Sequence, residues 1–175
     1  MVGYIALLRG VNVGGITVKS AELREVFESL GFESVRTVLA SGNVAFESDR
    51  ADAAALKRAI ESALGERFGY EAWIVLLTRA ELERVVAAFP FDAQREGWHP
   101  YVLFASDATH LAELVAAADG LDRADDVIAA GDGVVYWHCR RQAGVDSAFS
   151  KLTAKARFKP TTTNRNLRTL RKLLA

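Results

Sequence analysis

The sequence has little cysteine, little proline and no long hydrophobic run. It contains one cysteine among 175 residues, Cys139, which excludes an internal disulfide. No apolar segment approaches the roughly 18 residues that a membrane-spanning helix needs. Arg9 comes too early to leave room for the apolar stretch of a secretory signal peptide. We therefore expect a cytoplasmic protein with no membrane partner.

Recognisable metal-ligand and nucleophile motifs are also missing. The chain has no HxxxH, CxxC, HExxH or GxSxG pattern. His99, His110 and His138 are far apart in the sequence, and His138 and Cys139 would point to opposite faces of a strand. We expect no metal and no cofactor, and the sequence identifies no catalytic residue.

The net charge is zero, but the charges are unevenly distributed. Residues 1–139 hold 12 Lys and Arg against 21 Asp and Glu, whereas residues 140–175 hold 10 against one acid, Asp146. A basic segment of this kind favours an anionic partner such as RNA or a phosphorylated small molecule. The alternative is that the basic end folds back onto the acidic body of the same chain.

The order of apolar runs predicts an α+β fold. Strands are expected over residues 3–9, 34–39, 44–47 and 71–77. Helices are expected between Ser20 and a C-terminal cap at Gly31, and from Asp52 to an end near Gly65 or Gly69. The resulting order, βαββαβ, is that of the ferredoxin-like unit, in which two helices cover one face of a four-stranded antiparallel sheet. We place this subdomain at residues 1–78.

Residues 79–175 predict a second, smaller α+β subdomain. A helix capped by Thr78 and Glu81, a strand over 100–105, a helix from Asp107 and a hairpin over 127–138 give a βαββ order. The basic segment predicts two closing helices. One is expected over 147–157, and the other begins within the run Thr161 to Asn164, whose residues favour helix N-caps.

Two glycine-containing corners of the first subdomain are candidate binding loops. The segment RGVNVGG, residues 9–15, follows a buried strand, and glycines let an anion approach backbone N–H groups. Its spacing is neither that of a P-loop nor that of a dinucleotide fingerprint. The Ser-Gly-Asn corner at 41–43 can share the same sheet end. The candidate residues are Arg9, Gly10, Asn12, Gly14, Gly15, Ser41, Gly42 and Asn43. The alternative for both corners is a turn with no ligand.

A third candidate site lies in the basic segment. A helix N-terminus at Thr163 would offer free N–H groups, and Arg165 would add a fork of donors suited to phosphate. The candidates are Lys151, Thr163, Arg165 and Asn166. The alternative is a capping run that only starts the helix.

Binding of a phosphate-bearing, nucleotide-like or RNA ligand is the leading functional hypothesis. An enzyme acting on a phosphorylated small molecule and a protein–protein interaction module are the alternatives, and a homodimer is left open. Both ligand hypotheses predict that the polar candidates converge in space: Arg9, Asn12, Ser41, Asn43, Lys151, Arg165 and Asn166. Only Tyr4 and Phe46 on the first sheet could stack on bases, which disfavours that sheet as an RNA platform. The other large aromatic residues outside that sheet face are mostly expected in the core: Trp73, Tyr101, Tyr136 and Trp137. Trp98 is the exception, expected to be exposed and able to contact a ligand.

Four short motifs follow one another along the chain. They are the segments at 9–15 and 41–43, the triplet Ser150-Lys151-Leu152 and the Thr-rich segment ending in Arg165-Asn166. Together they resemble the bacterial domain-of-unknown-function family 1697 over essentially the whole chain. The resemblance implies a ferredoxin-like first part, a second α/β part and no established activity. The family usually has Trp after the Arg-Asn pair, whereas this chain has Leu167.

Overall fold

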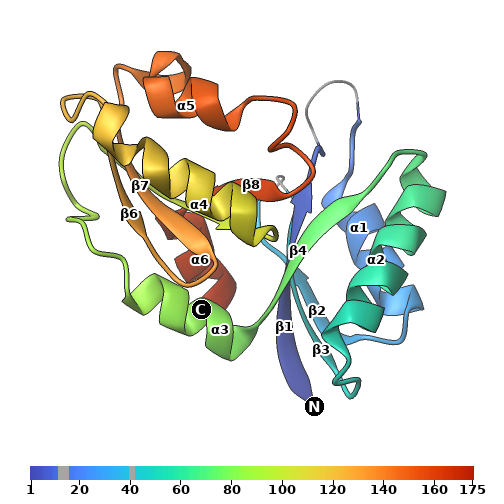
Figure 1. The fold of residues 1–175 in the computed structure, drawn as a ribbon. Helices are drawn as coiled ribbons and strands as arrows, with labels where there is room; N and C mark the ends of the chain where they lie inside the picture. Colours follow the sequence, from blue (N-terminus) through green and yellow to red (C-terminus); the bar gives the residue numbers. More distant parts are fainter. Residues whose placement is uncertain (12–15, 40–41) are drawn as a thin grey trace. The chain divides into compact units, whose positions relative to one another are not determined.

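The computed structural model describes residues 1–11, 16–39 and 42–175 and is shown in Figure 1. Four expected site residues lie outside the described residues: Asn12, Gly14, Gly15 and Ser41. The chain forms two compact units, one of residues 1–83 with 172–175 and one of residues 84–171. Within the described ranges, no helix combines the length and the apolar character needed to cross a membrane.

The first unit has the element order βαββαβ. Its elements are β1 (Val2–Arg9), α1 (Ser20–Ser29), β2 (Glu33–Thr37), β3 (Asn43–Ser48), α2 (Ala53–Phe68) and β4 (Trp73–Thr78), followed by the start of α3 (Arg79–Ala87). The four strands form an antiparallel sheet in the order β2-β3-β1-β4. This arrangement confirms the ferredoxin-like prediction for the N-terminal part.

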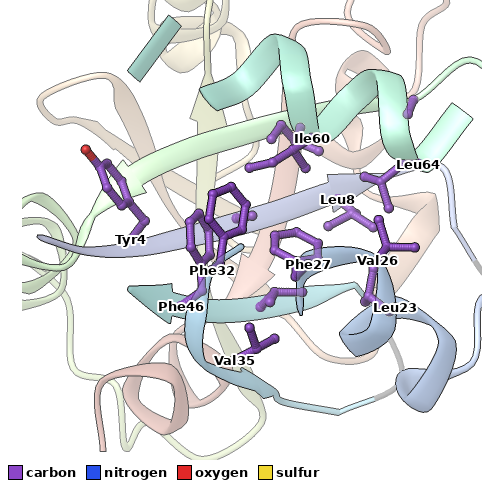
Figure 2. Close-up of a cluster of buried hydrophobic side chains, with 14 of the residues drawn as sticks. Tyr4, Leu8, Leu23, Val26, Phe27, Phe32, Val35, Phe46, Ile60 and Leu64 are labelled. Atoms are coloured by element: carbon purple, nitrogen blue, oxygen red, sulfur yellow. The ribbon is translucent and has the colours of Figure 1, made fainter. Parts of the chain in front are cut away.

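Aromatic rings fill the core of the first unit, between its sheet and its two helices (Figure 2). Phe32 stacks on Phe46 with ring centroids 4.4 Å apart, and Phe27 of α1 lies 5.3 Å from Phe46. Tyr4 stacks on Phe46 at 5.6 Å and donates a hydrogen bond to the Arg50 carbonyl at 2.9 Å. Tyr4 and Phe46 are 3% and 2% exposed, so neither ring is open to stack on a base.

The second unit repeats the same element order. Its elements are β5 (Trp98–Ala105), α4 (Ala108–Ala116), the 3-10 helix η1 (Ala117–Gly120), β6 (Asp126–Ala130), β7 (Val134–Arg140), the 3-10 helix η2 (Gly144–Asp146), α5 (Ala148–Thr153) and β8 (Thr162–Asn166). Helix α6 (Leu167–Leu174) follows. The sheet has the order β6-β7-β5-β8 and is antiparallel, which confirms the α+β class here too.

The fourth strand of this sheet corrects the expected helix start at Thr163. Residues 162–166 pair with β5, with Leu103 opposite Asn164 and Tyr101 opposite Asn166. Threonine is β-branched and suits a strand as well as an N-cap, so pairing with β5 decides between the two. Helix α6 starts only at Leu167, and the Asn166 side chain caps it by accepting from the Arg168 backbone N–H at 2.9 Å.

The helix expected over 147–157 is also shorter in the structure. Helix α5 begins after the N-cap Ser147, whose hydroxyl accepts from the Ser150 N–H at 3.2 Å, and ends at Thr153. Beyond it, Phe158 is fully buried in the same apolar cluster as Phe149. The chain turns to place this ring, and the Phe158 N–H donates to the Lys155 carbonyl at 3.0 Å.

Candidate functional site

The end of β1 and the start of β3 form one packed corner of the first unit. The Leu8 backbone N–H donates to the Gly42 carbonyl at 2.8 Å, and Leu7 is paired with Asn43. Gly42 has a φ of 75°, and a Cβ built there would lie 2.8 Å from both Leu8 Cβ and Val11 Cγ2. Glycine is therefore required for this close approach, and the described residues of the two corners, 9–11 and 42–43, do share one sheet end as expected.

Arg9 is the charged side chain at this corner. It is the last residue of β1, pairs with Trp73 of β4, and is partly buried. Strand alternation places it on the opposite face from Ala6 and Leu8, which belong to the core beneath α1 and α2. Burial lowers the pKa of the Arg9 guanidinium, although the group remains protonated at neutral pH. Gly10 follows it directly.

Asn43 is hydrogen-bonded across the turn that leads into β3. Its side chain is fully buried, and its Nδ2 donates to the Val38 carbonyl at 3.0 Å. The Val38 backbone N–H in turn donates to the Asn43 carbonyl at 2.9 Å. These two bonds give Asn43 a structural role in the turn, which is the alternative that the sequence left open.

Strand β8 places three expected site residues of the second unit. Arg165 Nη1 donates to Thr163 Oγ1 at 2.6 Å and to the Asn164 carbonyl at 2.9 Å, so the structure brings Arg165 and Thr163 together. Asn166 lies on the other face of the strand, because successive side chains of a strand alternate. Arg165 and Asn166 therefore point to different sides of the sheet.

Lys151 is the fourth expected residue of this unit and is exposed on α5. Arg9, Gly10, Gly42 and Asn43 belong to the first unit, whereas Lys151, Thr163, Arg165 and Asn166 belong to the second. The expected convergence of all these residues on one ligand stays a prediction.

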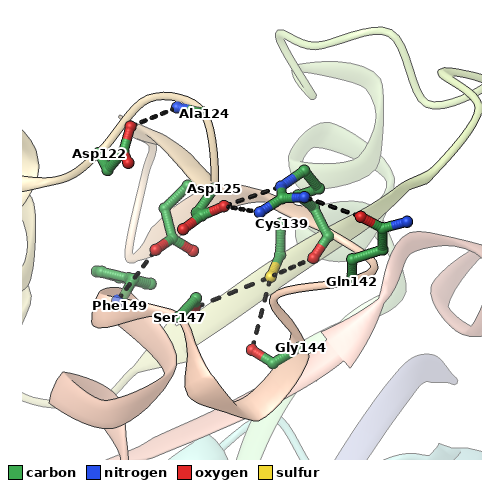
Figure 3. Close-up of polar contacts among 10 residues, drawn as sticks. Asp122, Ala124, Asp125, Cys139, Gln142, Gly144, Ser147 and Phe149 are labelled. Carbon is green, nitrogen blue, oxygen red and sulfur yellow. Dashed lines mark hydrogen bonds and ion pairs between the residues drawn. The ribbon is translucent and has the colours of Figure 1, made fainter.

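Part of the basic segment is neutralised within the second unit. Arg140 binds Asp125 through Nε at 2.8 Å and Nη2 at 2.5 Å, and the dashed lines at Asp125 in Figure 3 mark these two contacts. Arg157 forms an ion pair with Glu113 at 2.7 Å. Two arginines of the segment thus pair with acids of the chain itself, as the alternative interpretation of the charge distribution requires.

Cys139 lies in a structural environment. It is 1% exposed, and its thiol is 3.9 Å from both Ser147 Oγ and the Gly144 carbonyl (Figure 3). Burial raises the pKa of the Cys139 thiol, which disfavours the thiolate that a nucleophile needs. His138 points to the opposite face, where it stacks on Phe91. Among the described residues, no group of three or more His, Cys, Asp and Glu could hold a metal ion.

Two aromatic residues differ from their expected exposure. Trp98 is 7% exposed, because Arg95 covers its ring with the guanidinium carbon 3.9 Å from the ring centroid. Tyr101, expected in the core, is only partly buried, and its ring contacts His99 at 5.5 Å. The only sequence signal for this pair is their spacing of two, which puts both on one face of β5.

The fold has a known counterpart. The conserved bacterial protein SP0830 from Streptococcus pneumoniae is similar in structure, with a TM-score of 0.82 and 27% sequence identity; the match covers 99% of this chain and 96% of that one. No curated protein matches the chain. The model of the family described as "Protein of unknown function (DUF1697)" matches residues 1–136. The chain therefore belongs to the DUF1697 family.

Proposed function

We propose that the protein binds a phosphate-bearing ligand at the corner where β1 ends and β3 begins. The observation that carries the proposal is the partly buried guanidinium of Arg9 beside the packed Gly42 turn. A guanidinium that has lost part of its water interacts more strongly with an anion than an exposed one, and its fork matches two phosphate oxygens. Gly10, beside whose Cα no described atom would lie within 4 Å of an added Cβ, leaves the adjacent backbone open to a close ligand.

Further ligand contacts in this proposal come from the other candidate residues of the two loops, Asn12, Gly14, Gly15 and Ser41. Asn43 acts by shaping the turn. A small molecule suits the corner better than RNA, because Tyr4 and Phe46 of this sheet are buried and offer no platform for stacked bases.

The experiment is a thermal-shift screen of the unmodified protein, Arg9→Gln and Arg58→Gln against sugar phosphates and inorganic phosphate. Arg58 is exposed on α2, so Arg58→Gln removes the same charge from another part of the same unit. A ligand at about 100 times its Kd adds about 2.7 kcal/mol of stability, which raises the melting temperature by several degrees.

We expect a phosphate compound to raise the melting temperature of the unmodified protein and of Arg58→Gln. The rise should be largely lost in Arg9→Gln. An equal rise in all three proteins, or no rise with any phosphate compound, would remove the proposal.

A further inference from the structure

One end of the second sheet gathers polar and aromatic residues from three segments. His99 is the second residue of β5, and Tyr101 is paired with Asn166 at the end of β8. The residue after β7, Arg141, donates its backbone N–H to the Gly97 carbonyl at 2.7 Å. The register therefore brings the start of β5 together with the ends of β7 and β8.

Two rings are partly exposed at this end. Tyr101 lies between His99, at a centroid distance of 5.5 Å, and the buried Trp137, at 5.1 Å. Tyr101 and Trp137 belong to the cluster under α4 and α5, and His99 shares their face because it is two residues from Tyr101. The three rings form a row that runs from the core to the surface.

A short helix explains why this row reaches the surface. The second helix of the first unit, α2, has 16 residues, whereas the element at the same place in the second unit, α5, has six. In the first unit the tyrosine on the corresponding sheet face, Tyr4, is 3% exposed and packs on Phe46. The six-residue α5 covers less of its sheet, so Tyr101 and His99 keep exposed surface.

Two arginine side chains lie near these rings. Arg141 and Arg168 are exposed, and within the described part of the chain neither side chain has an ion-pair partner. Arg168 is positioned by its backbone N–H, which binds Asn166 Oδ1. Burial lowers the pKa of His99, and the positive charges of Arg141 and Arg168 lower it further. The positive charges of Arg141 and Arg168 therefore both act on the His99 imidazole.

We propose that this end of the second sheet binds a nucleoside monophosphate, with its base against the rings of Tyr101 and His99 and its phosphate between Arg141 and Arg168. A phosphate and a flat ring are the two features that guanidinium forks and exposed aromatic rings recognise together. One pair of arginines and one ring row match a single nucleotide. A longer RNA would need a track of several phosphate contacts and stacking positions.

This inference does not rest on the proposed function, because all its residues lie within residues 84–171 and none belongs to the β1–β3 corner. The two can be tested separately. Arg9→Gln should leave nucleotide binding at this end of the second sheet unchanged. Neutralising Arg141 and Arg168 should leave the Arg9-dependent rise in melting temperature unchanged.

The test measures binding of AMP, CMP, GMP and UMP by isothermal titration calorimetry, with adenosine and inorganic phosphate as partial ligands. The double variant Arg141→Gln/Arg168→Gln is compared with Lys155→Gln/Arg171→Gln. The control pair removes two exposed charges of the same unit from elsewhere on its surface. We expect at least one monophosphate to bind more tightly than phosphate or adenosine alone.

In the double variant we expect the affinity for that nucleotide to fall about tenfold or more, because two charge-assisted contacts are lost. In the control pair it should stay within about twofold. Tyr101→Leu should reduce nucleotide affinity and leave phosphate affinity unchanged, with His99→Leu as the second test of the rings if Tyr101→Leu does not fold. In NMR titrations, the bound phosphate should raise the pKa of His99.

Several results would overturn the proposal. The proposal is wrong if none of the four monophosphates binds the unmodified protein. It is also wrong if the control pair Lys155→Gln/Arg171→Gln loses as much affinity as the double variant, since that would indicate a diffuse charge effect. Preference for an oligonucleotide over every monophosphate, with a steep loss of affinity as salt rises, would assign the surface to RNA instead.

Discussion

Arg36 and Leu173 are hydrogen-bonded although 137 positions separate them in the sequence. Arg36 Nη2, on β2, donates to the Leu173 carbonyl at 2.7 Å. The same guanidinium donates to the carbonyls of Lys172 at 3.2 Å and Ala175 at 3.3 Å. A helix leaves the carbonyls of its last turn without partners inside the helix. Arg36 supplies partners for α6 and fixes residues 172–175 in the first unit.

Arg36→Ala is expected to lower the free energy of unfolding by about 1–2 kcal/mol, because it removes charge-assisted bonds to helix carbonyls. Urea denaturation followed by circular dichroism measures the change. Arg24→Ala is the control, since among the described residues Arg24 binds only Glu28, one helical turn away, and both side chains are at least half exposed. The free energy of unfolding of Arg24→Ala should fall by about 0.5 kcal/mol or less. Equal losses in the two variants would contradict the role of Arg36.

Gly42→Ala is expected to destabilise the protein by about 2–4 kcal/mol. The positive φ of this residue strains any L side chain, and the new methyl group would collide with Leu8 and Val11. Gly10→Ala is the matched comparison: Gly10 has a φ of 77°, but no described atom lies within 4 Å of its added Cβ. The free energy of unfolding of Gly10→Ala should therefore fall by only about 1–2 kcal/mol. The difference in midpoint between the two denaturation curves measures the contribution of the close approach.

His138 is expected to make stability fall in acid. Burial lowers its pKa below 6.5 in the folded protein, and Arg95 lowers it further, while Asp92 acts in the opposite direction. Below 6.5 the unfolded chain therefore binds this proton before the folded chain does. The free energy of unfolding is highest above that pH and decreases as the pH falls from about 7 towards 5.

His138→Phe removes this titration while keeping a ring against Phe91 and Trp98, whose centroids lie 5.6 and 5.2 Å from that of the imidazole. The imidazole Nε2 is buried without a hydrogen-bond partner among the described residues, so the replacement loses no bond there. Urea midpoints at several pH values should show a shallower acid dependence for the variant. An unchanged slope would mean that other groups, such as His99 with its own lowered pKa, account for the effect.

Local signals in the sequence predicted local structure well. The Thr78–Glu81 spacing indicated a capping box, and the structure contains both bonds: the Thr78 N–H to Glu81 Oε2 at 2.7 Å and the Glu81 N–H to Thr78 Oγ1 at 3.1 Å. The ferredoxin-like order of the first unit followed from apolar periodicity alone. Such features depend on residues a few positions apart, so a single sequence is enough to predict them.

Features that depend on distant pairing were missed. Strand β8 was predicted as a helix start, since its threonines favour both structures and only its pairing with β5 settles which one forms. The exposure of Tyr101 depends on the length of α5, which the periodicity of residues 147–157 overestimated. At the candidate site, the sequence predicted that the two polar corners lie together. It did not show that the Asn43 side chain would be hydrogen-bonded within the turn, to the Val38 carbonyl.

The inclusion of residues 172–175 in the first unit has a consequence for synthesis. Residues 84–171, which form the second unit, leave the ribosome before these four residues do. Until these four residues have left the exit tunnel, Arg36 has no helix carbonyls to bind and the first unit is incomplete. Domains usually fold from the N-terminus onward during translation, but here the N-terminal unit is completed only after the whole second unit has been synthesised.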